Sequence, residues 1–242
     1  MKKLLTVFLA VMMVSLLVVS CDDNSKEPVN SQASDKVYEI GDIGPAGGYV
    51  FYVADELKTI TYVNKDGNTQ TYQWKYLEAA PNDLDGKKSF GCNGPDQSRS
   101  AAGTSKSIGS GRENTRKLVN SMGTSADIST GMANTNNIGT DYAAYLCDDY
   151  KNSYKGEEFT DWFLPSSEEL EEMYKNLKAV GKGGTWQSGI YWSSSEDTSY
   201  PRIKAFVVNF GSSTEEAEAE VASRCLDGSA YTAFIRPIRA FK

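Results

Sequence analysis

The side chains available for chemistry set the first limit on what this chain can do. It has 32 Asp and Glu residues, 25 Lys and Arg residues, 4 cysteines and no histidine. Without imidazole the chain lacks the usual general base near neutral pH, the base of most serine and cysteine hydrolases, and the commonest transition-metal ligand. Paired carboxylates and oxygen-ligated calcium remain chemically available. From the sequence we assign no catalytic residue, no metal ligand and no cofactor.

Two groups of polar residues have types that catalysis uses but surroundings that do not favour it. Glu168, Glu169, Glu171 and Glu172 lie at helical spacing, where carboxylates more often cap a helix or face solvent. The serines at 193–195 are not set in a Gly-x-Ser-x-Gly elbow, and no histidine exists to activate a hydroxyl. A polysaccharide hydrolase with two carboxylates stays open as an alternative, because a sequence does not show which carboxyl groups face one cleft.

The stretch 161–177 predicts a strand or loop that runs directly into a capped helix. Pro165 disfavours helix at the residue before it, Ser166 can act as the N-cap, and Glu169 completes a capping box. The apolar stripe at i, i+3, i+4 and i+7 consists of Leu170, Met173, Tyr174 and Leu177.

The remaining pattern predicts one α+β domain at residues 39–242, with two or three helices packed on antiparallel strands and with long loops. Strands are expected at 49–53, 59–63, 69–77, 190–195, 203–210 and 231–241, and further helices at 112–122 and 141–150. An Asp-Gly turn signal within 65–68 makes the second and third of these strands a hairpin. The segment 82–111 is rich in Gly, Ser, Asn and Asp and is expected to be a long surface loop.

Aromatic residues alternate with polar ones along the expected strand 69–77. Tyr72, Trp74 and Tyr76 therefore share one face. A core face is the favoured interpretation, because half-buried strands need such a pattern, and a ligand-stacking platform is the alternative.

Residues 1–20 have the form of a bacterial secretory signal. Two lysines precede an apolar run at 4–19, and small Ser20 stands directly before Cys21. This ending resembles a lipobox, which implies cleavage before Cys21, a diacylglycerol on its thiol and acylation of its amine. An uncleaved membrane anchor is the alternative, but about 16 apolar residues are short for the roughly 20 that a span needs.

Residues 21–38 are expected to form a flexible tether, since they are mostly polar and contain little to bury. The predicted location is the bacterial cell envelope, at the outer membrane or cell surface, with the membrane as partner through the lipid on Cys21. The net charge is −7 and no long run of Lys or Arg is present. Nucleic acid is therefore not expected as a partner.

A loop between two late strands combines aromatic and charged side chains in the way that ligand surfaces do. The expected ligand-binding residues are Trp186, Glu196, Asp197, Tyr200 and Arg202.

Seven short motifs follow one another along residues 40–242. They are Gly-Pro-Ala-Gly-Gly at 44–48, Tyr76–Pro81, Gly131–Thr135, Cys147–Asp149, Asp161–Ser166, Tyr191–Glu196 and Ile235–Phe241. In this order they resemble the C-terminal domain of the Legionella collagen-like adhesin, a domain family common in bacterial lipoproteins. The most specific are Asp-Trp-Phe-Leu-Pro-Ser-x-x-Glu-Leu, Tyr-Trp-Ser-Ser-Ser-Glu and Ile-Arg-Pro-Ile-Arg-Ala-Phe.

The resemblance implies a variant of the C-type-lectin-like fold and a binding module. The Glu-Pro-Asn, Gln-Pro-Asp and Trp-Asn-Asp motifs of calcium-dependent sugar-binding lectins are absent from the sequence, so no calcium site is carried over. Lectin-like folds often tie a helix to the last strand by a disulfide, which here would join Cys147 to Cys225. From the residues alone, Cys92 could pair instead, or all three thiols could stay unpaired.

The sequence therefore predicts an envelope-anchored lipoprotein that presents a non-catalytic binding or adhesion domain for a glycan or a protein. The alternatives are the carboxylate-dependent polysaccharide hydrolase and a structural lipoprotein that assembles with other envelope components.

Overall fold

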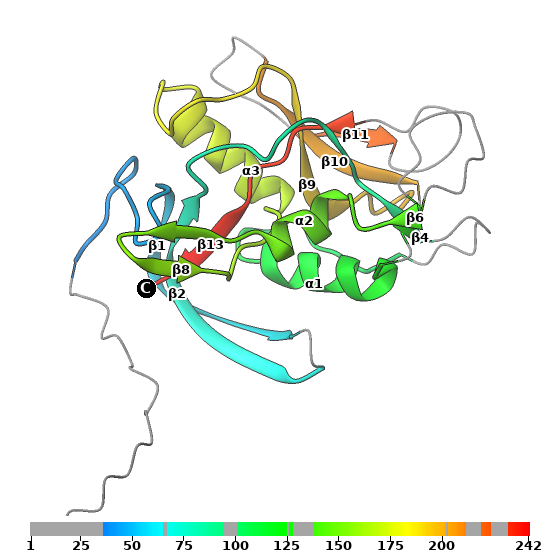
Figure 1. The fold of residues 1–242 in the computed structure, drawn as a ribbon, viewed down its shortest axis with the longest axis horizontal. Helices are drawn as coiled ribbons and strands as arrows, with labels where there is room; N and C mark the ends of the chain where they lie inside the picture. The colour runs from blue at the N-terminus through cyan, green and yellow to red at the C-terminus, as the bar shows by residue number, and fades with distance from the viewer. Residues whose placement is uncertain are drawn as a thin grey trace, which may run out of the picture. The chain divides into compact units, whose positions relative to one another are not determined.

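Strands from the beginning and the end of the described chain meet in one antiparallel sheet (Figure 1). In the computed structural model this sheet has the order β1 (Tyr49–Val63), β2 (Thr69–Ala79) and β13 (Ile238–Phe241). Ala79 of β2 pairs with a residue of each neighbour. Segments separated by almost the whole domain are thus hydrogen-bonded through one central strand.

The structure describes residues 36–64, 67–93, 101–124, 126–127, 138–201, 203–211, 219–223 and 232–242, all of which belong to one unit, Lys36–Lys242. Among these residues, no helix has both the length and the apolar character that crossing a membrane requires.

A second antiparallel sheet has the order β11 (Ala219–Ser223), β10 (Lys204–Asn209) and β9 (Ile190–Glu196). The described chain has three smaller sheets. β3 (Lys88–Ser89) pairs with β12 (Thr232–Ala233), β7 (Asn152–Tyr154) pairs with β8 (Glu157–Phe159), and a three-stranded sheet has the order β4 (Cys92–Asn93), β5 (Ala126–Asp127) and β6 (Ile138–Gly139). An isolated bridge joins Phe163 to Ile238 of β13, and another joins Phe234 to Tyr191 of β9. Each of the two larger sheets is thus linked to a segment outside it.

Three α-helices occur in the described part of the chain, and the α+β class is confirmed. They are α1 (Gly111–Met122), α2 (Ala143–Asp149) and α3 (Ser167–Met173), the last continuing as the π-helical turn η1 (Tyr174–Lys178). The predicted helices at 112–122 and 141–150 and the capped helix after Ser166 are therefore present.

The strands predicted at 49–53 and 59–63 form one continuous strand, β1, whose register against β2 is irregular. The pairing passes from Val53 opposite Tyr76 to Lys58 opposite Trp74, so the four residues 54–57 face one residue of β2. Extra residues of this kind bend a strand and increase its twist. Residues 54–57, which the prediction left outside any strand, are the irregular part of β1.

The predicted last strand, 231–241, is divided in two. Pro237 has no N–H to donate, and its carbonyl oxygen accepts a hydrogen bond from the Ala80 N–H at 2.8 Å. β12 therefore ends before Pro237 and β13 begins after it.

The apolar stripe predicted for the capped helix is confirmed. Leu170, Met173, Tyr174 and Leu177 are all buried in one core cluster with residues of β1, β2 and β9. A second cluster lies between α1, α2 and the opposite face of β9, where Trp192 is one of its members.

The Gly-Pro-Ala-Gly-Gly turn encloses the carboxylate of Glu78, which is fully buried. The Gly48 N–H donates to Oε1 at 2.7 Å and the Ala46 N–H at 3.2 Å. A Cβ at Gly44 would lie 2.4 Å from the carboxyl carbon, so only glycine leaves room there. Burial raises the pKa of Glu78, and the guanidinium of Arg239, with Nη1 at 3.3 Å from Oε2, opposes that shift.

Glu169 confirms the predicted capping box and has a second task. Its side chain accepts the Ser166 N–H at 2.7 Å, while the Ser166 hydroxyl accepts the Glu169 N–H at 3.3 Å. The same carboxylate accepts the Gly109 N–H at 2.8 Å, which fixes the turn before α1. Because Glu169 is fully buried, desolvation raises its pKa to about 7, against the hydrogen bonds that favour the charged form.

The raised pKa of Glu169 predicts a pH-dependent stability. A carboxyl with a higher pKa in the folded than in the unfolded chain stabilises the fold fully at low pH, and this contribution disappears as pH rises through the folded pKa. We expect the free energy of unfolding to fall by up to about 3 kcal/mol through this group between pH 4.5 and 7. Urea unfolding at several pH values measures this fall.

Glu169→Gln removes the titrating group and should lose this component of the pH dependence. Glu168→Gln, one position earlier in the same helical turn, should retain it. A wild-type protein and a Glu169→Gln variant whose stabilities run parallel across this pH range would contradict the prediction.

Candidate functional site

Trp186, one of the predicted ligand-binding residues, is half-buried and packs on the protein itself. Its indole N–H donates to the Lys182 carbonyl oxygen at 2.7 Å, and the Arg236 guanidinium lies 3.7 Å from the ring centroid. Phe210 packs on the same ring at 5.3 Å. The side chain therefore covers a buried arginine.

Glu196 and Asp197, also predicted to bind ligand, hold loops in place. The Glu196 carboxylate is buried and accepts the Ala102 N–H at 2.9 Å and the Gly103 N–H at 3.1 Å. Asp197 Oδ1 accepts the Ser199 N–H at 2.8 Å within its own turn. Trp186 packs on Tyr191 near the start of β9, whereas Glu196 ends this strand and binds Ala102 and Gly103, so the two side chains have separate partners.

Of the other two predicted ligand residues, the structure describes Tyr200. Tyr200 is 55% exposed, and the Lys204 ammonium lies 4.9 Å from its ring centroid. Arg202 lies outside the described residues, as does the predicted lipid attachment site Cys21.

The predicted disulfide between Cys147 and Cys225 is wrong. Cys147 is a free, fully buried thiol, whereas Cys92 is disulfide-bonded; Cys225 lies outside the described residues. The thiol of Cys147 faces the cluster between α1 and α2, and burial raises its pKa well above the usual value. The side chain points inward because of its position on α2. The thiol therefore serves as a small apolar group in the core.

The serine run in β9 is satisfied by hydrogen bonds inside the protein. Ser193 Oγ donates to the Phe206 carbonyl oxygen at 2.8 Å, and Ser195 Oγ donates to the Ser105 carbonyl oxygen at 2.8 Å. All three serines are fully buried. Strand packing and loop attachment account for them without a nucleophilic role.

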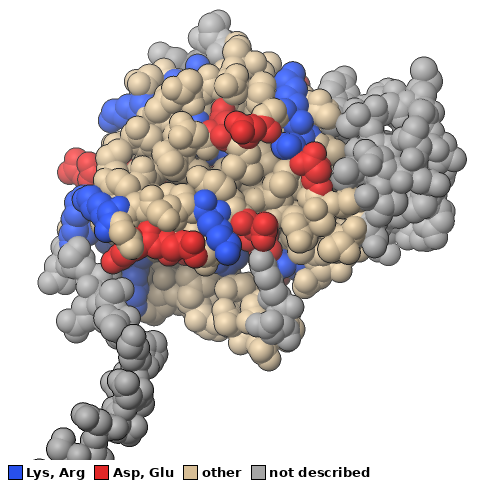
Figure 2. Space-filling model, in the orientation of Figure 1, with Lys and Arg blue, Asp and Glu red and all other residues tan. Residues whose placement is uncertain are grey.

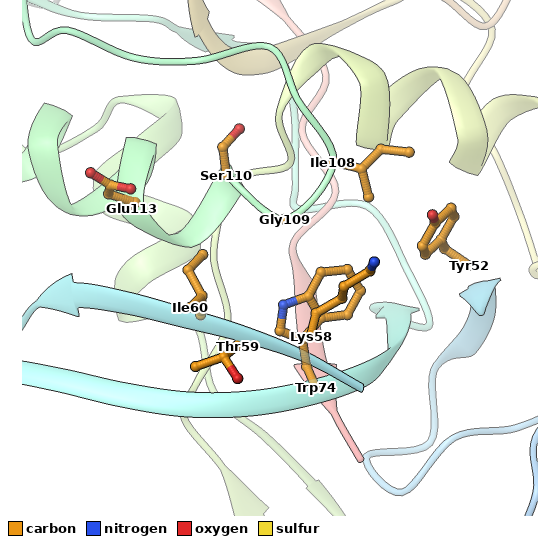
Figure 3. A pocket seen from close by; sticks show the side chains of 9 residues that line it. All are labelled: Tyr52, Lys58, Thr59, Ile60, Trp74, Ile108, Gly109, Ser110 and Glu113. Carbon is orange, nitrogen blue, oxygen red and sulfur yellow. The ribbon is translucent and has the colours of Figure 1, made fainter. Parts of the chain in front are cut away.

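A cleft of about 330 Å³ lies between the β1–β2 hairpin and the turn that leads into α1 (Figure 3). Its lining residues are Tyr52, Lys58, Thr59, Ile60, Trp74, Ile108, Gly109, Ser110 and Glu113. Tyr52 and Glu113 lie at opposite ends of the view in Figure 3. We take this cleft as the candidate site because it combines aromatic, aliphatic and polar side chains in one concave surface.

Local structure on both sides explains why the cleft forms. On the hairpin side, Lys58 lies where the register of β1 resumes after the irregularity. On the other side, Glu169 holds the Gly109 N–H, and Gly109 has φ 91°. A Cβ on Gly109 would lie 2.9 Å from Trp74 Cζ2, so the turn packs directly on the indole.

The polar groups of the cleft are available to a ligand. Lys58 pairs with Glu56 at 3.0 Å and Glu113 pairs with Lys117 at 2.8 Å, and all four side chains are at least 39% exposed. Ion pairs with this exposure contribute little to stability, so a ligand can replace either partner. The cleft thus offers a cation and a carboxylate beside an aromatic wall.

For the alternation of Tyr72, Trp74 and Tyr76 the sequence favoured a core face over a ligand-stacking platform. Trp74 and Tyr76 are buried, as the core interpretation predicts, but Tyr76 packs in a different cluster from Tyr72 and Trp74, so the three rings do not form one face. Trp74 also forms part of the cleft wall. No sequence pattern indicated Lys58 or Ile108 as residues of the site. The position of Lys58 depends on the irregular register of β1, and that of Ile108 depends on the hydrogen bond from the neighbouring Gly109 N–H to Glu169 of α3.

The charged residues in the lining of the cleft are Lys58 and Glu113. Glu113 is the one carboxylate in its lining, whereas glycoside hydrolysis ordinarily requires two that face the same bond. Within the described ranges, no three Asp, Glu or Cys side chains form a group suited to a metal ion. Comparison of the chain with protein-family models, curated proteins and solved structures gave no match.

The contact between Gly109 and Trp74 predicts the effect of a substitution. Gly109→Ala adds both the strain of a positive φ and a methyl group against the indole, and we expect it to lower the free energy of unfolding by about 2 to 3 kcal/mol in urea unfolding. Gly103→Ala is the matched control, because Gly103 has φ 74° and nothing within 4 Å of an added Cβ. It should lose only about 1 kcal/mol. Equal losses in the two variants would show that the turn does not rest on Trp74.

Proposed function

We propose that this protein is a lipoprotein of the bacterial cell envelope that presents a non-catalytic binding or adhesion domain to a glycan or a protein. The observation that carries the proposal is the cleft beside Trp74. Half-buried Tyr52 can contact the apolar face of a ligand there, and Lys58 and Glu113 can interact with its polar groups.

The carboxylates of the described residues support binding over hydrolysis. Glu78, Glu169 and Glu196 are buried, and each accepts backbone N–H groups that hold a turn or loop. Carboxylates bound in this way position the chain, and they are not placed to transfer a proton to a ligand in the cleft. Binding therefore accounts for the cleft with fewer requirements than catalysis.

The motif resemblance supports the finer part of the proposal, a C-type-lectin-like domain of the family found in the Legionella collagen-like adhesin. Glu78, Trp162, Trp192, Arg236 and Arg239 are motif residues, and all five are buried. These residues therefore contribute to the packed framework of the domain. The motif Gly131–Thr135 lies outside the described residues.

Surface charge also fits this kind of partner. On the face in Figure 2 the described Lys and Arg side chains are interspersed with Asp and Glu. The net charge of −7 disfavours a polyanionic ligand held by charge alone. A neutral glycan or a polar protein surface suits the mixed charges better.

Glycan and matrix-protein arrays probed with the full-length protein in detergent test the binding function. We expect a saturable ligand whose affinity falls at least about fivefold, near 1 kcal/mol, in Lys58→Ala and in Tyr52→Ala. Lys75→Ala is the matched control, because Lys75 is the neighbour of Trp74 on β2 but does not line the cleft. The proposal fails if no array component binds at high protein density, or if Lys75→Ala weakens binding as much as the cleft variants.

Membrane attachment through Cys21 is tested separately. In the native host, the wild-type protein should incorporate radiolabelled palmitate and sediment with membranes, because two or more acyl chains anchor a protein firmly. Cys21→Ser should lose the label, and Ser20→Ala, which keeps a small residue before the cysteine, should retain it. Palmitate in the Cys21→Ser variant would refute the lipoprotein assignment.

A further inference from the structure

A second cavity, of about 170 Å³, lies on the other part of the hairpin, between β1, α1 and the segment before α3. Its lining residues are Tyr62, Asn64, Arg112, Arg116, Asp148, Thr160, Asp161, Trp162 and Phe163. We refer to it as the arginine cavity. It shares no lining residue with the cleft of Figure 3.

Arg116 has one edge of its guanidinium unused. Its Nη1 donates to both oxygens of Asp148, at 2.8 and 3.0 Å. Nε is buried, and no described group accepts a hydrogen bond from it. The side chain is 7% exposed, so the donor is largely withdrawn from solvent as well. A buried donor left unpaired destabilises the folded chain, and a ligand acceptor would remove this penalty.

Arg112 brings a second buried guanidinium to the same helix face, four residues earlier. Its Nε donates to the Tyr72 hydroxyl at 3.0 Å and its Nη2 to the Asp161 carbonyl oxygen at 2.8 Å. The Asp161 carboxylate lies 3.5 Å from Arg112 Nη2 but 2.9 Å from Arg239 Nε. One carboxylate is thus shared by two guanidiniums, and the charge of Arg112 is balanced only in part.

The geometry points to a carboxylate-binding subsite in the arginine cavity, with the guanidinium of Arg116 as its cation. The unmet group is a donor on a cation, so its complement is an anionic acceptor, and a planar carboxylate matches the guanidinium fork. Tyr62 and Phe163, whose ring centroids lie 5.6 and 4.8 Å from Arg112 Cζ, provide apolar walls for the rest of a small ligand. This subsite does not depend on the proposed function of the cleft.

Calorimetric titration of the full-length protein in detergent tests the subsite with four probes: acetate, galacturonate, galactose and sulfate. Saturable millimolar binding of galacturonate alone, or of galacturonate and acetate, supports the subsite, and the two results distinguish a carboxylate on a sugar from a free carboxylate. Galactose and sulfate should bind at least about tenfold more weakly, a difference of about 1.4 kcal/mol. Absence of carboxylate binding, or equal binding of galactose or sulfate, overturns the inference.

Two variants locate the binding at the arginine cavity. Arg116→Lys keeps the positive charge but loses the fork, and should weaken carboxylate binding by about tenfold. Asn64→Asp keeps the oxygen that accepts the Asn68 N–H at 2.9 Å and adds a negative charge at the cavity, so it should weaken carboxylate binding in a normally folded protein. Lys117→Gln, on the exposed side of α1, is the control and should leave binding unchanged. Carboxylate affinity that Asn64→Asp does not lower would place the ligand elsewhere and refute the subsite.

Discussion

The guanidinium of Arg239 holds together parts of the chain that are far apart in sequence. It contacts Glu78 of β2 at 3.3 Å and Asp161 of the segment before α3 at 2.9 and 3.1 Å. Glu78 in turn holds the turn at 44–48. Removing one partner of a buried pair typically costs 3 to 5 kcal/mol, since it leaves the other charge uncompensated. The first turn, the central strand and the last strand of the domain therefore depend on one cation.

Buried carboxylates accept hydrogen bonds that hold the irregular segments of this domain in place. Glu169 fixes the turn before α1, Glu196 fixes residues 102–104, and Asp83 accepts a hydrogen bond from Arg236 Nε at 2.6 Å. Each carboxylate satisfies backbone or side-chain donors that a long irregular segment would otherwise leave unpaired. The loops are consequently held in defined positions, which is what a binding surface requires.

Local patterns predicted the elements well. The capping box of Ser166 and Glu169, the stripe on the helix that follows, and the Asp-Gly hairpin each depend on residues only a few positions apart. The predicted ligand residues depended on distant partners. Glu196 has the type and the loop position of a ligand-binding residue, but its hydrogen-bond donors lie more than ninety positions earlier, and no local pattern contains that information. The disulfide fails for a similar reason, because the pairing partner of a cysteine is decided by tertiary packing.

The irregular strand β1 has a mechanical consequence. Its N-terminal end continues back toward the predicted tether, and its residues 58–60 line the cleft. The hydrogen bonds between β1 and β2 run perpendicular to the strands. A force applied along β1 at residues 58–60 loads many of these bonds in shear at once, whereas a sideways pull opens them one by one. The hairpin therefore resists a load along β1 better than a load across it.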